Sequence, residues 1–185
     1  MDELIDILDA DGNPTGQSCM KSEAHRDGLF HPTVHIWFYT SDGEVLLQQR
    51  GKDKDTYPLL WDVSVAGHVG TGEDIEESAV REVAEEIGLK IRPSDLQKIG
   101  VFKSVQKHSE HFIDREFHHT FVCELKQPME NLKMQESEVE ALDSIPISQF
   151  KKEVLDSMPD KYVPHKKKYY ETIFKALESK LIENR

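Results

Sequence analysis

One segment near the middle of the chain constrains the fold more than any other, because residues 74–87 have the spacing of an amphipathic helix with glycines on both sides. At about 100° per residue, its apolar side chains fall on one face, namely Ile75, Ala79, Val80, Val83, Ala84 and Ile87. Gly70 and Gly72 permit a loop before it, and Gly88 stands where a left-handed cap ends a helix. The pattern predicts a helix that packs one face on a core.

Three glutamates, Glu82, Glu85 and Glu86, lie beside that apolar face, within an arc of about 100°. Each like-charged pair at such spacing costs about 0.2–0.5 kcal/mol, and one neighbouring cation, Arg81, does not neutralise three carboxylates. A hard divalent cation does, because Mg²⁺ and Mn²⁺ take carboxylate oxygens and keep waters or phosphate oxygens as further ligands. A solvated acidic face is the alternative interpretation.

The residues around the glutamates favour the metal. Gly67, Glu73 and Gly88 stand at fixed offsets from the run 81–86, and the complete pattern resembles the signature of the Nudix hydrolases. That resemblance implies an α/β fold, an α/β/α sandwich with a central mixed sheet. It also implies a Mg²⁺- or Mn²⁺-dependent enzyme that cleaves a phosphoanhydride bond in a nucleoside or other organic diphosphate.

The same resemblance assigns roles to single residues. Glu82, Glu85 and Glu86 are the expected metal ligands, with the Gly67 carbonyl as a backbone ligand. Glu85 is a candidate base. Arg81 and Glu73 are expected to pair and to orient the carboxylates. Glu138 is an alternative base, since many Nudix enzymes place one in the loop that corresponds to residues 135–141; an exposed acidic turn explains Glu136, Glu138 and Glu140 equally well.

The remaining pattern predicts a sheet with helices on both faces. Strands are expected over residues 4–8, 33–39, 44–49, 61–68, 97–106 and 111–125, and helices over 20–27, 147–155 and part of 160–181. Ser41-Asp42-Gly43 is typical of a hairpin turn. We expect one Nudix domain over residues 1–185, with a core over about 30–155 and a C-terminal helical extension over 156–185.

A second set of residues narrows the resemblance. The runs 25–31, 46–50 and 57–61 resemble isopentenyl-diphosphate isomerase, a divergent Nudix branch. This implies diphosphate contacts from Arg50 and Lys54, and imidazole–carboxylate ligation that suits Mn²⁺, Zn²⁺ or Fe²⁺. The implied ligands are three histidines and two carboxylates: His25, His31, His68, Asp114 and Glu116. Alternatively, His68 caps a loop, and His31 or His35 is an ordinary core histidine.

One departure argues against isomerase chemistry. The isomerase resemblance requires a cysteine directly before the Gly67-His68 pair, and Ala66 stands there. An alanine methyl cannot move a proton. Hydrolysis is therefore the first expectation, with an isopentenyl-diphosphate isomerase and a non-catalytic diphosphate-binding module as alternatives.

Composition limits the partners. The net charge of -12 and the pI of about 5.2 argue against a nonspecific nucleic-acid binder, which would show a basic face. The first residues lack the features of a signal peptide, and no apolar run approaches the ~20 residues of a membrane span. We expect a cytoplasmic protein with a small-molecule diphosphate substrate and no membrane partner. The oligomeric state stays open.

Overall fold

The structure is a computed structural model that describes residues 2–157 and 160–183. Its elements follow in the order β1 (Leu4–Leu8), β2 (Pro14–Met20), α1 (Lys21–Asp27), β3 (His31–Tyr39), β4 (Glu44–Arg50), β5 (Trp61–Asp62), β6 (Val65–His68), α2 (Ile75–Ile87), β7 (Gln97–Lys107), β8 (Ile113–Glu124), β9 (Val139–Pro146), α3 (Ile147–Lys152) and α4 (Lys167–Glu183). Short helical turns cover Pro93–Asp95, Met129–Asn131 and Glu153–Ser157.

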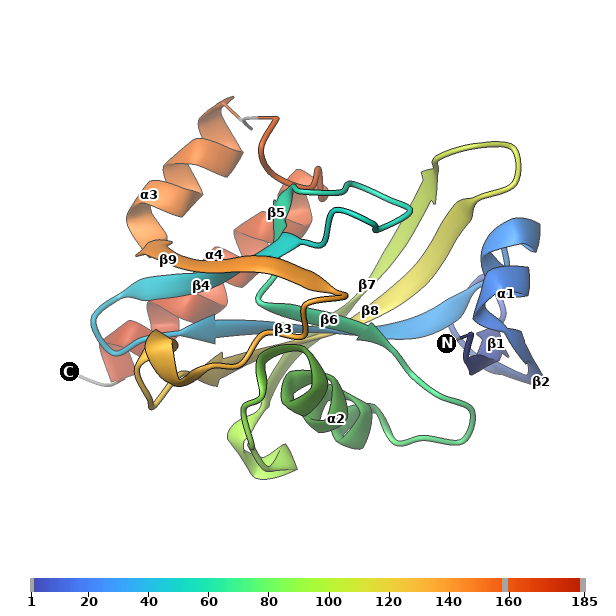
Figure 1. The fold of residues 1–185 in the computed structure, drawn as a ribbon, viewed down its shortest axis with the longest axis horizontal. Coiled ribbons are helices and arrows are strands. Elements are labelled where there is room, and N and C mark those ends of the chain that lie inside the picture. Colours follow the sequence, from blue (N-terminus) through green and yellow to red (C-terminus); the bar gives the residue numbers. More distant parts are fainter. Residues whose placement is uncertain (1, 158–159, 184–185) are drawn as a thin grey trace.

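A mixed sheet forms the centre of the molecule (Figure 1). Among the described residues it has seven strands, in the order β5-β4-β3-β8-β7, with β6 beside β3 and β9 beside β4. β3 and β8 are parallel, whereas β4, β6, β7 and β9 each run antiparallel to the strand they join. β1 and β2 form a separate two-stranded sheet. The predicted mixed sheet is therefore confirmed.

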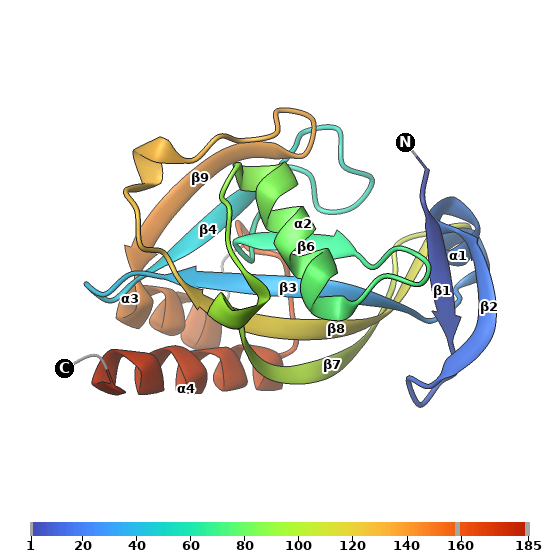
Figure 2. The same cartoon turned by 90° about the horizontal axis from the view of Figure 1, so that it is seen from below.

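Alternation along β3 explains the layers, because successive side chains of a strand point to opposite faces. Trp37 and Tyr39 join a buried cluster with α3 and α4. Ile36 and Phe38 join a second cluster with α2. Figure 2 shows α2 and α4 on opposite sides of the sheet, as an α/β/α sandwich requires.

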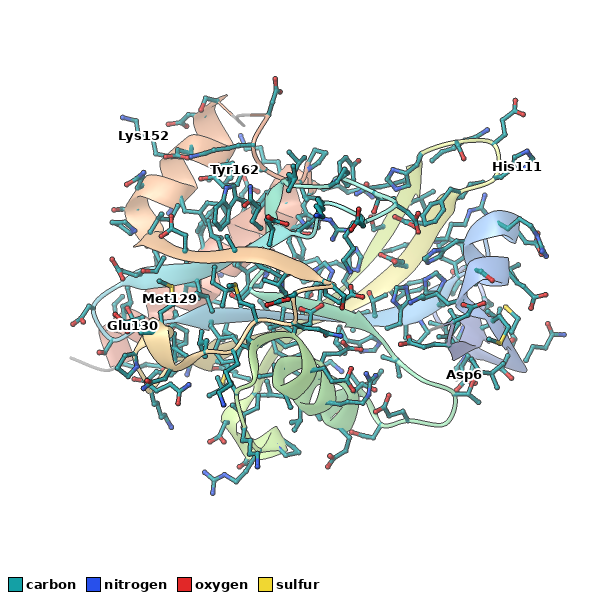
Figure 3. All side chains as sticks on the ribbon, in the orientation of Figure 1. Asp6, His111, Met129, Glu130, Lys152 and Tyr162 are labelled. Atoms are coloured by element: carbon teal, nitrogen blue, oxygen red, sulfur yellow. The ribbon has the colours of Figure 1, made fainter. Side chains whose placement is uncertain are left out.

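The C-terminal helix α4 supplies part of this core. Tyr170, Ile173, Phe174 and Leu177 are at most 1% exposed and pack in the cluster that contains Trp37. The segment before α4 is also held. Tyr162 lies beside α3 (Figure 3), and its hydroxyl donates to Glu153 Oε2 at 2.6 Å. The expected C-terminal extension thus packs on the same sheet as the rest of the chain.

Both ends of α2 follow from the local sequence. The Asp74 side chain accepts hydrogen bonds from the backbone N–H groups of Glu76 and Glu77, so the helix begins one residue later than the expected range. Gly88 ends the helix with φ 65°, the left-handed conformation that glycine adopts without strain. The helix therefore ends at the residue that the sequence indicated.

The strand expected over residues 61–68 is wrong as a single element. It divides into β5, which pairs with β4, and β6, which pairs with β3. Ser64 lies between them, where its hydroxyl accepts from Phe38 N at 2.9 Å and donates to Leu46 O at 2.5 Å. The chain changes its pairing partner at this point, from β4 to β3, because β3 and β4 are paired only near Tyr39 and Val45. The Ser64 hydroxyl bridges the two strands where they separate.

Two further boundaries also differ. The acidic loop expected over 135–141 ends earlier, because Val139 is already paired with Arg50 at the start of β9. The helix expected over 147–155 is α-helical only to Lys152 and continues as a π-helical turn.

Among the described residues, none of the helices combines the length and apolar character that crossing a membrane takes.

Candidate active site and metal centre

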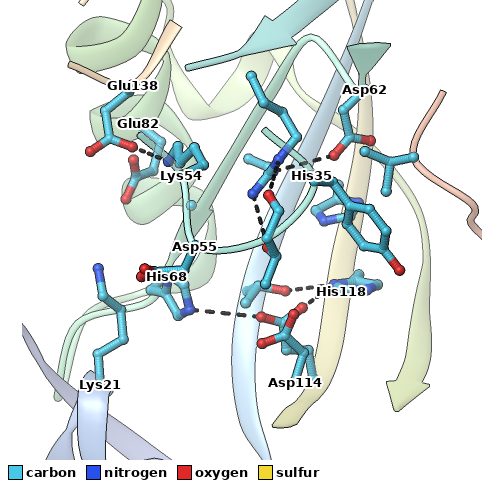
Figure 4. Close-up of a pocket in the computed structure, with 18 of the residues that line it drawn as sticks. Lys21, His35, Lys54, Asp55, Asp62, His68, Glu82, Asp114, His118 and Glu138 are labelled. Atoms are coloured by element: carbon cyan, nitrogen blue, oxygen red, sulfur yellow. Dashed lines mark hydrogen bonds and ion pairs between the residues drawn. The ribbon is translucent and has the colours of Figure 1, made fainter. Parts of the chain in front are cut away.

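A cavity of about 380 Å³ opens beside β6, and most of the residues predicted from the sequence line it. Two groups of metal-ligand side chains meet there. One is the carboxylate group of α2, and the other is an imidazole group carried by α1, β3, β6 and β8. Figure 4 shows His68 and Glu82 on the same side of this cavity. The two predicted sites therefore share one cavity.

The carboxylate group depends on a close approach between α2 and β6. Glu82 and Glu86 are 8% and 4% exposed, respectively. A Cβ atom added to Gly67 would lie 2.0 Å from Glu82 Cδ, which leaves no room for any side chain there. Only glycine lets the Glu82 carboxyl lie against the strand at this point.

Burial changes the protonation of these carboxyls. Loss of hydration raises the pKa of Glu82 to about 7, and it raises the pKa of Glu86 to about 8. The Gln48 amide donates to Glu86 Oε2 at 2.8 Å and offsets part of that rise. Two neighbouring carboxyls that are costly to ionise in the metal-free protein suit a divalent cation, because it would replace the missing hydration.

Arg81 contacts residues of both groups, Glu82 of the carboxylate group and the backbone of His68 of the imidazole group. Its Nε and Nη2 donate to the two oxygens of Glu73 at 2.9 and 3.0 Å. Its Nη1 also donates to Glu82 Oε1 at 2.7 Å, and its Nη2 donates to the His68 carbonyl at 3.0 Å. The hydrogen bonds from Arg81 lower the pKa of Glu73 to about 2. The expected pairing of Arg81 with Glu73 is present, and it fixes α2 against the end of β6.

Glu85 differs from its two neighbours. Its side chain is 50% exposed, and its Oε2 atom lies 3.3 Å from Arg81 Nη1. It also lines the cavity. Among the three glutamates it is the one with an exposed side chain.

The imidazole group follows from the strand register. β3 and β8 place His31 beside Glu116, and β3 and β6 place Thr33 beside His68. His25 joins them from α1. One ligand atom from each of His25, His31, His68 and Glu116 lies within 4.8 Å of the others.

One buried nitrogen of this group has no hydrogen-bond partner, as a metal ligand in a metal-free protein would. His31 Nε2 is buried and makes no hydrogen bond. The Nε2 atoms of His25 and His68 are only 3.3 Å apart. Imidazole nitrogens that converge in this way are, once deprotonated, the donors that Mn²⁺, Zn²⁺ or Fe²⁺ takes.

Asp114, the fifth expected ligand, lies at the edge of the group. Its Oδ2 atom is 2.8 Å from His108 Nε2, and its buried Oδ1 atom has no hydrogen-bond partner and is 3.9 Å from His25 Nε2. Burial raises the pKa of Asp114 to about 6. It lies outside the four ligand atoms that converge within 4.8 Å, and its role as a fifth ligand stays a prediction.

The charges within the group are uneven. Burial lowers the pKa of His25 to about 4, and it holds the pKa of His68 well below its ordinary value. Burial acts in the same direction on His31, yet Glu116 outweighs it and raises the pKa of His31. Burial likewise opposes the ionisation of Glu116, but His31 and His118 hold its pKa well below the usual range. His25 and His68 thus offer neutral, metal-binding imidazoles.

Arg50 and Lys54, the expected diphosphate contacts, both line the cavity. Arg50 donates to the backbone and side-chain oxygens of Thr56 at 3.0 and 3.2 Å, and it lies 3.6 Å from Asp62. Lys54 is ion-paired with Glu138, the loop glutamate considered as a base. Arg50 therefore holds the loop between β4 and β5 in place. Lys54 is bound to a carboxylate, so another anion can replace Glu138 as its partner.

Other cavity residues were not predicted: His35, Asp62, His118 and His165. Alternation along β8 was a usable signal for His118, because it lies two residues after Glu116 and shares its face. The same holds for His35, which lies four residues after His31 on β3. His165 had no such signal, because a separate segment brings it to Asp62, 103 residues away in sequence.

Comparisons with known proteins agree with the fold. A family model described as the NUDIX domain matches residues 29–172. Nudix hydrolase 3 of Arabidopsis thaliana is 35% identical over 168 residues, which cover 89% of this chain but 22% of that protein. An uncharacterized Nudix hydrolase of Clostridium acetobutylicum is 33% identical over 203 aligned positions, which cover 95% of this chain and 97% of that protein.

Two more similarities bear on the prediction. The isopentenyl-diphosphate Delta-isomerase of Nocardia farcinica is 37% identical over 100 residues, or 54% of this chain and 55% of that enzyme. The crystal structure of DR0079 from Deinococcus radiodurans shares the fold, with a TM-score of 0.68 at 16% identity over 96% of this chain and 98% of that one. The chain therefore belongs to the Nudix family, and the predicted enzyme class of Nudix hydrolase is confirmed.

We expect the metal-free protein to lose stability as the pH rises from about 4.5 to about 8. The folded pKa values of Glu82 and Glu86, about 7 and about 8, lie above the ordinary 4.5, so the folded state holds more protons in this range. Their stabilising protonated form is lost as the pH passes through those values. Thermal unfolding in a chelator should show a falling midpoint.

The double variant Glu82→Gln/Glu86→Gln should flatten that pH dependence, because its amides do not ionise. Glu77→Gln, on the exposed part of the same helix, is the matched control and should keep the wild-type slope. An identical slope in the double variant and the wild type would show that other groups cause it.

Proposed function

We propose that this protein is a divalent-metal-dependent hydrolase that cleaves the phosphoanhydride bond of an organic diphosphate. The substrate has the form X-P-P, and the products are X-phosphate and phosphate or a second phosphorylated product. The observation that carries the proposal is the pair of buried carboxyls beside β6, Glu82 held by Arg81 and Glu86 held by Gln48. When bound, Mg²⁺ or Mn²⁺ would supply positive charge to the phosphate oxygens and lower the pKa of water.

The other groups have defined parts in this proposal. Glu82 and Glu86 hold the metal, with the Gly67 carbonyl as a further ligand. Glu85, whose exposed side chain lines the cavity, is in a position to take a proton from water. Lys54 binds a phosphate oxygen after leaving Glu138, which then becomes free to act as the alternative base.

Substitution of single glutamates tests these parts. Glu86→Gln keeps the shape of the side chain but removes a charge that the metal requires, and Glu85→Gln removes the proposed base. Turnover should fall by about 10²–10⁴-fold where the base is lost. Phosphate release from a panel of organic diphosphates with Mg²⁺ or Mn²⁺ is the measurement. Glu77→Gln should keep wild-type turnover, and full activity in both test variants would refute the assignment.

An isopentenyl-diphosphate isomerase is the second candidate, since His25, His31, His68 and Glu116 converge as that branch implies. Ala66 opposes it. Its register partner on β3 is His35, and no thiol occupies the position beside Gly67. A methyl group cannot deliver the proton that isomerisation needs.

We therefore expect no deuterium from D₂O to enter isopentenyl diphosphate and no dimethylallyl diphosphate to form. Mass spectrometry of a metal-supplemented reaction measures both, with chelator-treated protein as the background. Formation of dimethylallyl diphosphate above that background would restore the isomerase and displace the hydrolase.

A further inference from the structure

The cavity has a second wall, which the proposed hydrolysis does not use. We call it the inner polar wall, and it consists of Thr33, His35, Asp62, Ser104, His118 and His165. Figure 4 shows His35, Asp62 and His118 across the cavity from Glu82 and Glu138. The residues come from β3, β5, β7, β8 and the segment before α4, so they are assembled by the whole fold.

Two of the three imidazoles of this wall, those of His35 and His118, are held from within the protein. His35 Nδ1 lies 2.7 Å from the Tyr169 hydroxyl, which also accepts from Trp37 Nε1 at 2.9 Å. His118 Nδ1 lies 2.8 Å from Thr33 Oγ1. The rings stack with centroids 4.0 Å apart and an interplanar angle of 20°. Among the described residues, no protein group hydrogen-bonds the Nε2 atom of either ring.

A carboxylate completes the wall. Asp62 Oδ1 lies 2.6 Å from His165 Nε2, and its Oδ2 atom lies 3.6 Å from Arg50. Burial opposes its ionisation, but His165 and Arg50 outweigh that effect and keep the pKa of Asp62 low. The wall thus presents an ionised carboxylate, two imidazole edges and two hydroxyls to whatever enters.

This chemistry selects among possible X groups. A hydrocarbon against the wall would strip water from these polar atoms and return no hydrogen bond, which is costly for a buried polar group. A nucleobase would need a flat apolar or aromatic surface for stacking. The aromatic residues that line the cavity, Tyr57 and Phe112, instead pack against His108 and His25 at the other end. Hydroxyl groups both donate and accept, so they match carboxylate, imidazole and hydroxyl partners together.

We propose that the inner polar wall recognises the X group and that X is a hydroxylated carbon skeleton, a sugar or a polyol. This inference rests on the proposed diphosphate hydrolysis, because the wall is assigned to the part of the substrate beyond the phosphates. His35, His118 and Asp62 lie at one end of the cavity, and the carboxylate and imidazole groups lie at the other. A bound substrate would therefore place X against the inner polar wall and its diphosphate against the carboxylate and imidazole groups.

A matched pair of substrates tests it. Ribose 5-diphosphate and isopentenyl diphosphate each have five carbons in X, but only the first carries hydroxyls there. Methyl diphosphate has almost no X and reports on the phosphate chemistry alone. With Mg²⁺, kcat/KM should be at least about tenfold higher for ribose 5-diphosphate than for isopentenyl diphosphate, since a site built for hydroxyls discriminates strongly against their absence.

Variants of the wall separate recognition from catalysis. His35→Phe keeps a ring on His118 but removes the polar edge, and Ser104→Val changes a half-buried position of the wall without opening the core. Each should lower kcat/KM for ribose 5-diphosphate by about tenfold, the value of one hydrogen bond, while methyl diphosphate changes by less than about twofold. His119→Phe is the matched control. It is on β8 next to His118 but faces the other side of the sheet and does not line the cavity.

Thermal unfolding of each variant shows whether it is folded, and Ser104→Val carries the test if His35→Phe is not. If methyl diphosphate is hydrolysed and isopentenyl diphosphate is used as well as or better than ribose 5-diphosphate, the wall does not recognise hydroxyl groups, and the proposed function stands.

If no diphosphate is hydrolysed, the proposed function fails. Calorimetric measurement of substrate binding in the presence of Ca²⁺ then tests the role of the wall. Tighter binding of ribose 5-diphosphate, weakened by the wall variants, supports it, and equal binding of the pair refutes it.

Discussion

The absence of a side chain at Gly67 is the constraint on which the rest of the site depends. With a Cβ atom 2.0 Å from Glu82 Cδ, α2 could not lie against β6 as it does. Moving α2 away would break the contact of Arg81 with the His68 carbonyl and remove the backbone N–H of Ala66 from Glu86, 3.4 Å away. One glycine therefore sets the distance between the carboxylate group and the strand that carries His68.

Strand alternation then separates two kinds of chemistry. Gly67 pairs with Val34 on the face that meets α2, whereas His68 pairs with Thr33 on the face that carries His31 and His35. The α2 carboxylates thus lie on one side of β6, and the imidazole group, which includes Glu116, lies on the other. Mg²⁺ prefers carboxylate oxygens and borderline metals prefer imidazoles, so the two groups suit metals of different character. The inner polar wall lies on the same face as the imidazole group. It is where we propose that the organic group X binds.

The sequence was most informative where local rules decide the structure. The limits of α2 and the carboxylate spacing depend on residues close in the chain, so helix periodicity and capping indicate them. The pairing of Arg81 with Glu73 was expected from the resemblance to the Nudix signature. The division of residues 61–68 into two strands depends on Ser64 joining β3 and β4, which no local pattern reveals. His165 reaches Asp62 through the packing of α4, a contact across 103 residues. Alternation along β8 indicates that His118 shares the face of Glu116.

Manganese binding to the metal-free protein tests the central claim most directly, namely that two separate ligand groups flank β6. Calorimetric titration should resolve two classes of Mn²⁺ in the wild type. Glu82→Gln/Glu86→Gln should lose one class, and His25→Ala/His31→Ala should lose the other. The imidazole class should weaken as the pH falls through about 6.5, because protonated histidine does not bind metal. Wild-type stoichiometry and affinity in both double variants would contradict the account.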